Sequence, residues 1–106
     1  MLDAQHLALD LIRLLRPVRD RLTQRAPRLA DQLERAATSV ALNLAEGSGR
    51  FGRDKRRAYR VAYGEIAEVK AALAAAVAWG HVEADSVGDA LALADRVARV
   101  AFALAR

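Results

Sequence analysis

The chain has 106 residues, enough for one domain with a single core but too few for a catalytic domain plus a second module. Hydrophobic residues make up 54% of it, chiefly Ala and Leu, and aromatic residues only 5%. Because Ala and Leu favour helices over strands, we expect an all-α protein. The sequence contains no Cys, which excludes disulfides, thiolate metal sites and Cys nucleophiles.

The formal net charge is +4, and it is unevenly distributed along the chain. Residues 1–60 carry 13 Arg and Lys against 7 Asp and Glu, whereas residues 61–106 carry 4 against 6. Fifteen of the 17 cations are Arg, whose planar guanidinium can hold a phosphate or a carboxylate. A GC-rich genome, which favours Arg and Ala, explains this composition equally well.

The apolar run near the start of the chain is interrupted by charged and polar residues, namely Asp3, His6, Asp10 and Arg13. We therefore expect neither a signal peptide nor a membrane span there, and no membrane partner. Together with the absence of Cys, this leads us to expect a cytoplasmic protein.

Four segments have apolar residues at three- and four-residue steps, the pattern of an amphipathic helix. In chain order, we expect helices over residues 3–24, 28–47, 54–79 and 86–105, all in one domain spanning residues 1–106. Short connections between such helices favour an antiparallel up-down four-helix bundle. The positions expected to face the core are Leu7, Leu11, Leu14, Leu15, Val18 and Leu22; Leu29, Leu33, Ala36, Ala37, Val40, Ala41 and Leu44; Tyr59, Ala62, Ile66, Val69, Leu73 and Ala76; and Leu91, Ala94, Val97, Ala101 and Leu104.

Several residues indicate how these helices begin, bend and end. Pro17 lies inside the first helix, where a missing N–H predicts a kink or a short break. We expect Asp54 to cap the start of the third helix and Gly80 to end it. Ser86 with Asp89 resembles a capping box for the fourth helix.

The glycines between the second and third helices have the spacing of a dinucleotide-binding turn, G-x-G-x-x-G, at Gly47, Gly49 and Gly52. In that fold the glycines follow a strand and open a helix within a βαβ unit, whereas here they follow a helix and no strand is expected. We therefore expect them to end the second helix and to turn the chain through positive φ.

Four-helix bundles can hold a carboxylate-bridged di-metal centre, which needs two Glu-x-x-His motifs. Glu65 and Glu68 have the three-residue spacing, but neither His6 nor His81 follows a Glu by three residues. The two histidines are far apart in the expected bundle and form no acid–base pair. We expect no metal, no cofactor and no enzymatic activity.

Two pairs of polar residues lie one turn apart: Asn43 with Glu46 in the second helix, and Glu65 with Glu68 in the third. Helices joined by a short corner lie side by side, so these groups can approach each other or nearby arginines. Because a buried carboxylate needs a partner, we expect Glu46 to brace the corner; a direct ligand role is the alternative. The arginines within reach of Glu46 are Arg50, Arg57 and Arg60.

The cations between residues 50 and 60 are the best candidates for a functional site. Glycines beside several cations, with Phe51 and Tyr59 interleaved, are typical of a surface that contacts nucleic acid. Folded RNA, which offers phosphates and splayed bases, fits such a surface too. The alternative is a solvated corner whose cations pair with Asp54 and neighbouring carboxylates. The cations are Arg50, Arg53, Lys55, Arg56, Arg57 and Arg60.

The segment AALAAAVA, residues 71–78, is made almost entirely of small side chains. Small side chains let helices approach closely, although each buries little area. A helix of this kind can be apolar on more than one side, which would suit a subunit interface. An ordinary Ala-rich core helix is the alternative.

Two stretches resemble the bacterial 23S rRNA intervening-sequence proteins, also called S23-type four helix bundle proteins. RAATSVALNLAEGSGR (residues 35–50) follows their pattern R-A-x-x-S-I-x-x-N-I-A-E-G-x-G-R, and AYGEIAEV (residues 62–69) follows A-x-G-S-x-x-E. Glu65 stands where the family has Ser. The matching residues are Arg35, Ala36, Ser39, Asn43, Ala45, Glu46, Gly47, Gly49, Arg50, Ala62, Gly64 and Glu68, of which we expect Asn43, Glu46, Gly47, Gly49, Gly64 and Glu68 to form a structural motif.

The resemblance implies a left-handed bundle, a ring-like homopentamer, and genes within rRNA insertions or standing alone with no established activity. A related bundle, the accessory protein of diversity-generating retroelements, is a basic pentamer that works with a reverse transcriptase and nucleic acid. We therefore expect a non-enzymatic oligomer that binds RNA or DNA through the basic corner. The alternative is a protein-interaction scaffold whose arginines serve subunit contacts.

Overall fold

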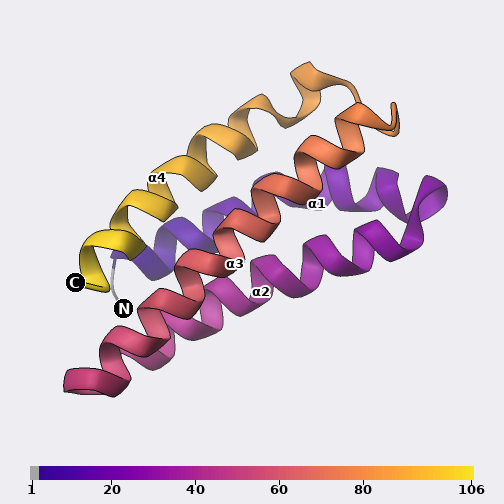
Figure 1. Ribbon diagram of the computed structural model, residues 1–106. Helices are drawn as coiled ribbons and strands as arrows, with labels where there is room; N and C mark the ends of the chain where they lie inside the picture. Colours follow the sequence, from indigo (N-terminus) through magenta and orange to yellow (C-terminus); the bar gives the residue numbers. More distant parts are fainter. Residues whose placement is uncertain (1–2) are drawn as a thin grey trace.

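The computed structural model describes residues 3–106 and confirms an all-α four-helix bundle (Figure 1). Its helices are α1 (Asp3–Arg25), α2 (Pro27–Ser48), α3 (Gly52–Ala78) and α4 (Gly88–Leu104), with a 3-10 turn, η1 (Ala84–Val87), before α4. Helices adjacent in sequence pack on each other, and α1 packs on α4 to close the bundle. Figure 1 shows the ribbon reversing direction at each corner. The left-handed twist stays a prediction.

The core is filled by apolar side chains from all four helices. Among the largest are Leu11, Leu33, Ile66 and Leu73, each at most 1% exposed. Every core position expected on the third helix is buried. Leu14 of α1 was expected in the core but is 39% exposed, because the neighbouring apolar positions of its helix already fill the core-facing side. No helix within residues 3–106 is long and apolar enough to cross a membrane.

Pro17 does not interrupt α1, which continues from Asp3 to Arg25. The flanking residues Leu15 and Val18 are buried in the core, and their packing outweighs the loss of one backbone hydrogen bond. The expected short break is therefore wrong, while a kink stays a prediction.

Gly80 ends α3 as expected, with a φ of +76°. Its N–H donates to the carbonyl of Val77 at 2.9 Å, and the N–H of His81 donates to the carbonyl of Ala76 at 2.9 Å. This pair of hydrogen bonds is the Schellman motif, which satisfies carbonyls that a helix end would otherwise leave free.

Both expected N-terminal caps are wrong. Helix α3 begins at Gly52, so Asp54 lies inside its first turn, and no side chain caps the helix. Ser86 lies in η1, where its hydroxyl donates to the carbonyl of Glu83 at 2.6 Å, and α4 begins only at Gly88. Helix α3 thus begins before Asp54, and α4 begins after Ser86. In both places core packing rather than capping decides where the helix begins.

Gly47 lies within α2, where the ring of Tyr59 from α3 packs on its backbone. A Cβ at this position would lie only 2.5 Å from Cε1 of Tyr59, whose side chain is 1% exposed. Of the three glycines in the corner only Gly52 has a positive φ, at +55°. Gly47 is therefore required for a close approach of two helices, and Gly52 for the turn.

We expect the substitution Gly47→Ala to destabilise the protein by about 1–3 kcal/mol, because the added Cβ would clash with the ring of Tyr59, which is buried and would have to shift within the core. Gly49→Ala is the matched control: a Cβ there would meet only the carbonyl oxygen of Glu46 at 3.7 Å, an ordinary contact. The free energy of unfolding, measured with urea, checks both variants. Equal stabilities of the two would contradict the assignment of a packing role to Gly47.

Candidate nucleic-acid interface

Four arginines cover the exposed side of the first turns of α3. They recur at three- and four-residue steps, which places them on one face of the helix, opposite the core. All four are exposed, and within residues 3–106 none makes an ion pair or a hydrogen bond. We call this set the basic face; it comprises Arg53, Arg56, Arg57 and Arg60.

The two remaining cations of the expected site lie elsewhere. Arg50, in the corner before α3, forms an ion pair with Oε1 of Glu46 at 3.3 Å. This is one of the three pairings expected for Glu46, but both side chains are exposed, so it contributes little to stability. Lys55 lies one turn before the buried Tyr59 and points to the side of α3 that meets the core, where it is half-buried.

The basic face begins in the first turn of α3, at the positive end of the helix dipole, where anions are stabilised and cations are not. Phe51 precedes the first turn without capping it, and Asp54 is its single acidic residue. The cations near this end therefore oppose the helix dipole and lack partners in the described chain. An anion bound beside them would meet both side-chain charges and the field of the helix terminus.

The aromatic residues expected to assist this site behave differently from one another. Phe51 is 88% exposed at the corner, whereas Tyr59 is 1% exposed and faces the core, so Tyr59 cannot stack on a base. Two exposed aromatic residues were missed from sequence: Tyr63 of α3 and Phe102 of α4, whose ring centroids lie 5.6 Å apart. Tyr63 follows Arg60 by three residues, a spacing that already places the two on one side of the helix.

Polar side chains form a seam between α2 and α3, on the side of α3 that faces α2. Arg35 of α2 forms ion pairs with Glu65 at 3.2 Å and with Glu68, and the amide of Gln32 donates to Glu68 at 3.1 Å. The hydrogen bond from Gln32, aided by the charge of Arg35, lowers the pKa of Glu68. Glu65 therefore adds an ion pair between these helices.

Within residues 3–106, Asn43 makes no hydrogen bond across this seam. Its amide donates within α2, to the carbonyl of Ser39 at 2.9 Å and to the Ser39 hydroxyl at 3.1 Å. Asn43 also lines a depression of about 370 Å³ at the corner, together with two acids and two arginines. These charges are Glu46, Arg50, Asp54 and Arg57. The opposite charges balance, so this depression is a weaker anion site than the basic face.

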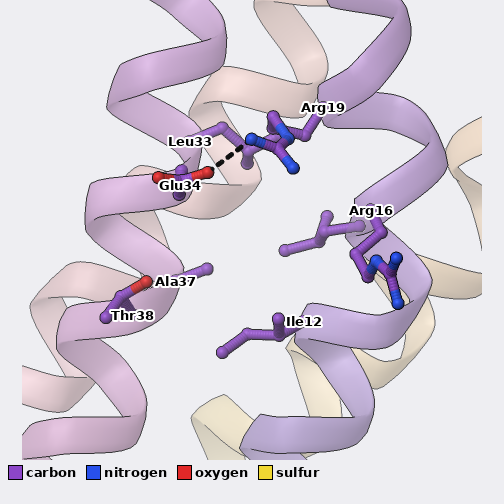
Figure 2. Close-up of a pocket in the computed structure, with 8 residues that line it drawn as sticks. Ile12, Arg16, Arg19, Leu33, Glu34, Ala37 and Thr38 are labelled. Carbon is purple, nitrogen blue, oxygen red and sulfur yellow. Dashed lines mark hydrogen bonds and ion pairs between the residues drawn. The ribbon is translucent and has the colours of Figure 1, made fainter.

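Another depression, of about 290 Å³, lies between α1 and α2 (Figure 2). Its lining is mainly apolar, and the ion pair between Arg19 and Glu34, at 2.7 Å, spans one edge. Arg16 is the one cation of this lining that makes no ion pair in the described chain. The depression therefore offers too little positive charge to hold a polyanion.

We expect Glu68→Gln to lower stability near neutral pH, with a difference from the wild type that shrinks in acid. The folded-state pKa of Glu68 lies below its ordinary value of 4.5, so its stabilisation is present above that pH and is lost as pH falls through the folded-state value. Urea unfolding between neutral pH and about pH 3 measures this.

The control is Glu83→Gln, since the Glu83 carboxylate makes no ion pair within the described residues. A difference between Glu68→Gln and wild type that stayed constant at every pH would contradict the role of ionised Glu68 in the seam.

Comparison with known proteins agrees with the architecture. A crystal structure of a protein of unknown function from the S23 ribosomal protein family of Bacteroides thetaiotaomicron superposes with a TM-score of 0.87. The two chains share 15% identity, and the match covers 97% of this chain and 98% of that chain. At this identity the likeness shows the fold alone. No curated protein matches the chain significantly.

The sequence itself matches the 23S rRNA-intervening sequence protein family over residues 2–103, nearly the whole chain. The match includes both stretches that carry the motif residues, from Arg35 to Arg50 and from Ala62 to Val69. The chain therefore belongs to the 23S rRNA-intervening sequence protein family.

Proposed function

We propose that this protein is a non-enzymatic, self-associating bundle of the cytoplasm that binds RNA or DNA phosphates through the basic face. The observation that carries the proposal is the set of four exposed arginines that make no ion pair in the described chain. Unpaired cations at the positive end of a helix destabilise the fold slightly, and phosphates would offset this. The proposed site also includes Arg50, in the corner before α3, and Lys55, which lies outside the basic face on the core side of the helix.

The spacing of the arginines suits a nucleic-acid backbone. Arg53 and Arg60 are seven residues apart, which corresponds to about 10 Å along the helix axis. Phosphates of one strand recur about every 3.4 Å along a duplex, so the face spans about three nucleotides. Arg can hold a phosphate with two parallel hydrogen bonds, whereas Lys holds it as a point charge.

Reversing the charge of Arg53, Arg56 and Arg57 to Glu should abolish nucleic-acid binding and leave the fold and the oligomer intact. The wild type should bind labelled structured RNA and duplex DNA with an affinity that falls steeply as salt rises. Fluorescence anisotropy across a salt series measures binding, and light scattering measures the mass. The variant should be no less stable than the wild type, since Glu replaces a cation at the positive end of α3.

The matched control reverses Arg16, Arg21 and Arg28 to Glu. These residues are also exposed and make no ion pair within residues 3–106. Both triple variants change the formal net charge from +4 to −2, since each of three reversals removes two units. Equal loss of binding in both would mean that net charge acts, not the basic face. Dissociation of the first variant would instead assign the arginines to subunit contacts.

Self-association is supported by the outer face of α3 beyond the basic face. This stripe is exposed and made of small residues, and it comprises Gly64, Ala67, Ala71, Ala74 and Ala78. A Cβ at Gly64 would meet nothing within 4 Å, so nothing in the described chain requires glycine there. Glycine inside a helix costs about 0.5–1 kcal/mol relative to Ala, which a close approach by another subunit would explain. The family resemblance implies five subunits.

We expect Ala71→Glu to lower the mass of the oligomer, because it places a charge in the middle of this stripe. Light scattering measures the mass, and circular dichroism checks that the helices remain. The matched control is Ala92→Glu, an exposed Ala on α4 outside the stripe. If Ala71→Glu keeps the wild-type mass, the stripe is not the subunit interface, and its exposed small residues are left for a protein partner.

A further inference from the structure

Tyr63 and Phe102 form an exposed aromatic pair between α3 and α4, which we call the aromatic platform. Their rings are tilted by 53° with centroids 5.6 Å apart, and the residues are 43% and 51% exposed. The guanidinium carbon of Arg106 lies 5.4 Å from the centre of the Phe102 ring. The platform therefore presents aromatic surface to solvent beside a cation.

The surroundings of the platform are positively charged. It lines a depression of about 520 Å³ together with Lys70, Asp95, Arg99 and Arg106. Lys70 and Asp95 neutralise each other in an ion pair of 2.5 Å. Arg99 and Arg106 make no ion pair in the part of the chain that the structure describes, so the depression keeps an excess of positive charge.

The platform continues the basic face along the same helix. Arg60 precedes Tyr63 by three residues and Arg56 precedes it by seven, so all three lie on the flank of α3 that faces α4. The Cα atoms of Arg56 and Tyr63 are therefore about 10 Å apart. A strand whose phosphates contact the basic face can reach the platform without leaving the surface of α3.

We propose that the aromatic platform stacks unpaired bases of a single-stranded nucleic acid whose phosphates contact the basic face. The inference rests on the proposed function and deepens it by naming the form of the nucleic acid. Every base has a π-face that stacks on an aromatic ring, whereas the bases of a duplex are already stacked and paired. A purely apolar protein partner would desolvate the excess positive charge of this depression without supplying a counter-charge.

The test replaces both rings with Leu, as Tyr63→Leu with Phe102→Leu, which keeps apolar bulk and removes the π-faces. The full chain is titrated into fluorescein-labelled oligo-dT and oligo-U of about 20 nucleotides and into a duplex of equal length. We expect the double variant to bind the single strands about 10- to 100-fold more weakly, with duplex binding and the salt dependence unchanged. Trp79→Leu is the matched control, because Trp79 is 77% exposed at the opposite end of α3.

Each other outcome overturns the inference in a recognisable way. If the wild type binds single strands and the double variant binds them equally well, the platform does not stack bases, although the proposed function stands. If the wild type binds no nucleic acid at low salt, the proposed function fails and the inference fails with it. If the double variant loses mass in light scattering, the rings belong to a protein interface instead.

Discussion

The contact between the Tyr59 ring and the backbone of Gly47 determines how closely α3 packs on α2 next to the corner. With no Cβ at Gly47, the ring lies directly on α2 and is almost completely buried. Because Tyr59 points into the core, helix geometry turns Arg57 and Arg60, two residues before it and one residue after it, to the outside, and Arg56 is exposed as well. The close packing of two helices at one glycine is therefore what turns a run of cations into an exposed basic face.

Charged side chains have different partners on two sides of α3. Toward α2, the carboxylates Glu65 and Glu68 meet Arg35, so the charges neutralise one another and join the helices. On the outer face the arginines make no ion pair within the described chain, and those near the start of α3 interact unfavourably with the helix dipole. Charged side chains that pair with each other contribute to the fold, whereas charged side chains without an ion pair are available to a ligand.

The proposed nucleic-acid surface combines two kinds of interaction on one helix. Cations near the start of α3 supply attraction that does not depend on base sequence and weakens with salt. One to two turns further, Tyr63 and Phe102 add aromatic surface that a paired duplex cannot use. The proposed subunit interface, the small-residue stripe, uses other side chains of α3, so nucleic-acid binding and assembly as proposed need not compete for the same side chains.

The sequence alone was sufficient to predict the helices and most of the core positions, because apolar residues at helical spacing must face inward in any bundle. The end of α3 at Gly80 was likewise readable, since local backbone rules decide it. The sequence also located the basic run. Its helical spacing correctly placed Tyr59 in the core, but Tyr59 was also expected to assist the basic run, which its burial excludes.

Only the tertiary structure decided which neighbours each side chain meets. Both helix starts were misread at Asp54 and Ser86, because capping contributes less than the packing that positions a helix. Gly47 proved to be a packing glycine, which requires knowing that Tyr59 lies across from it. The platform joins residues 39 positions apart, Tyr63 and Phe102, and such a long-range contact depends on how two helices align rather than on any local pattern.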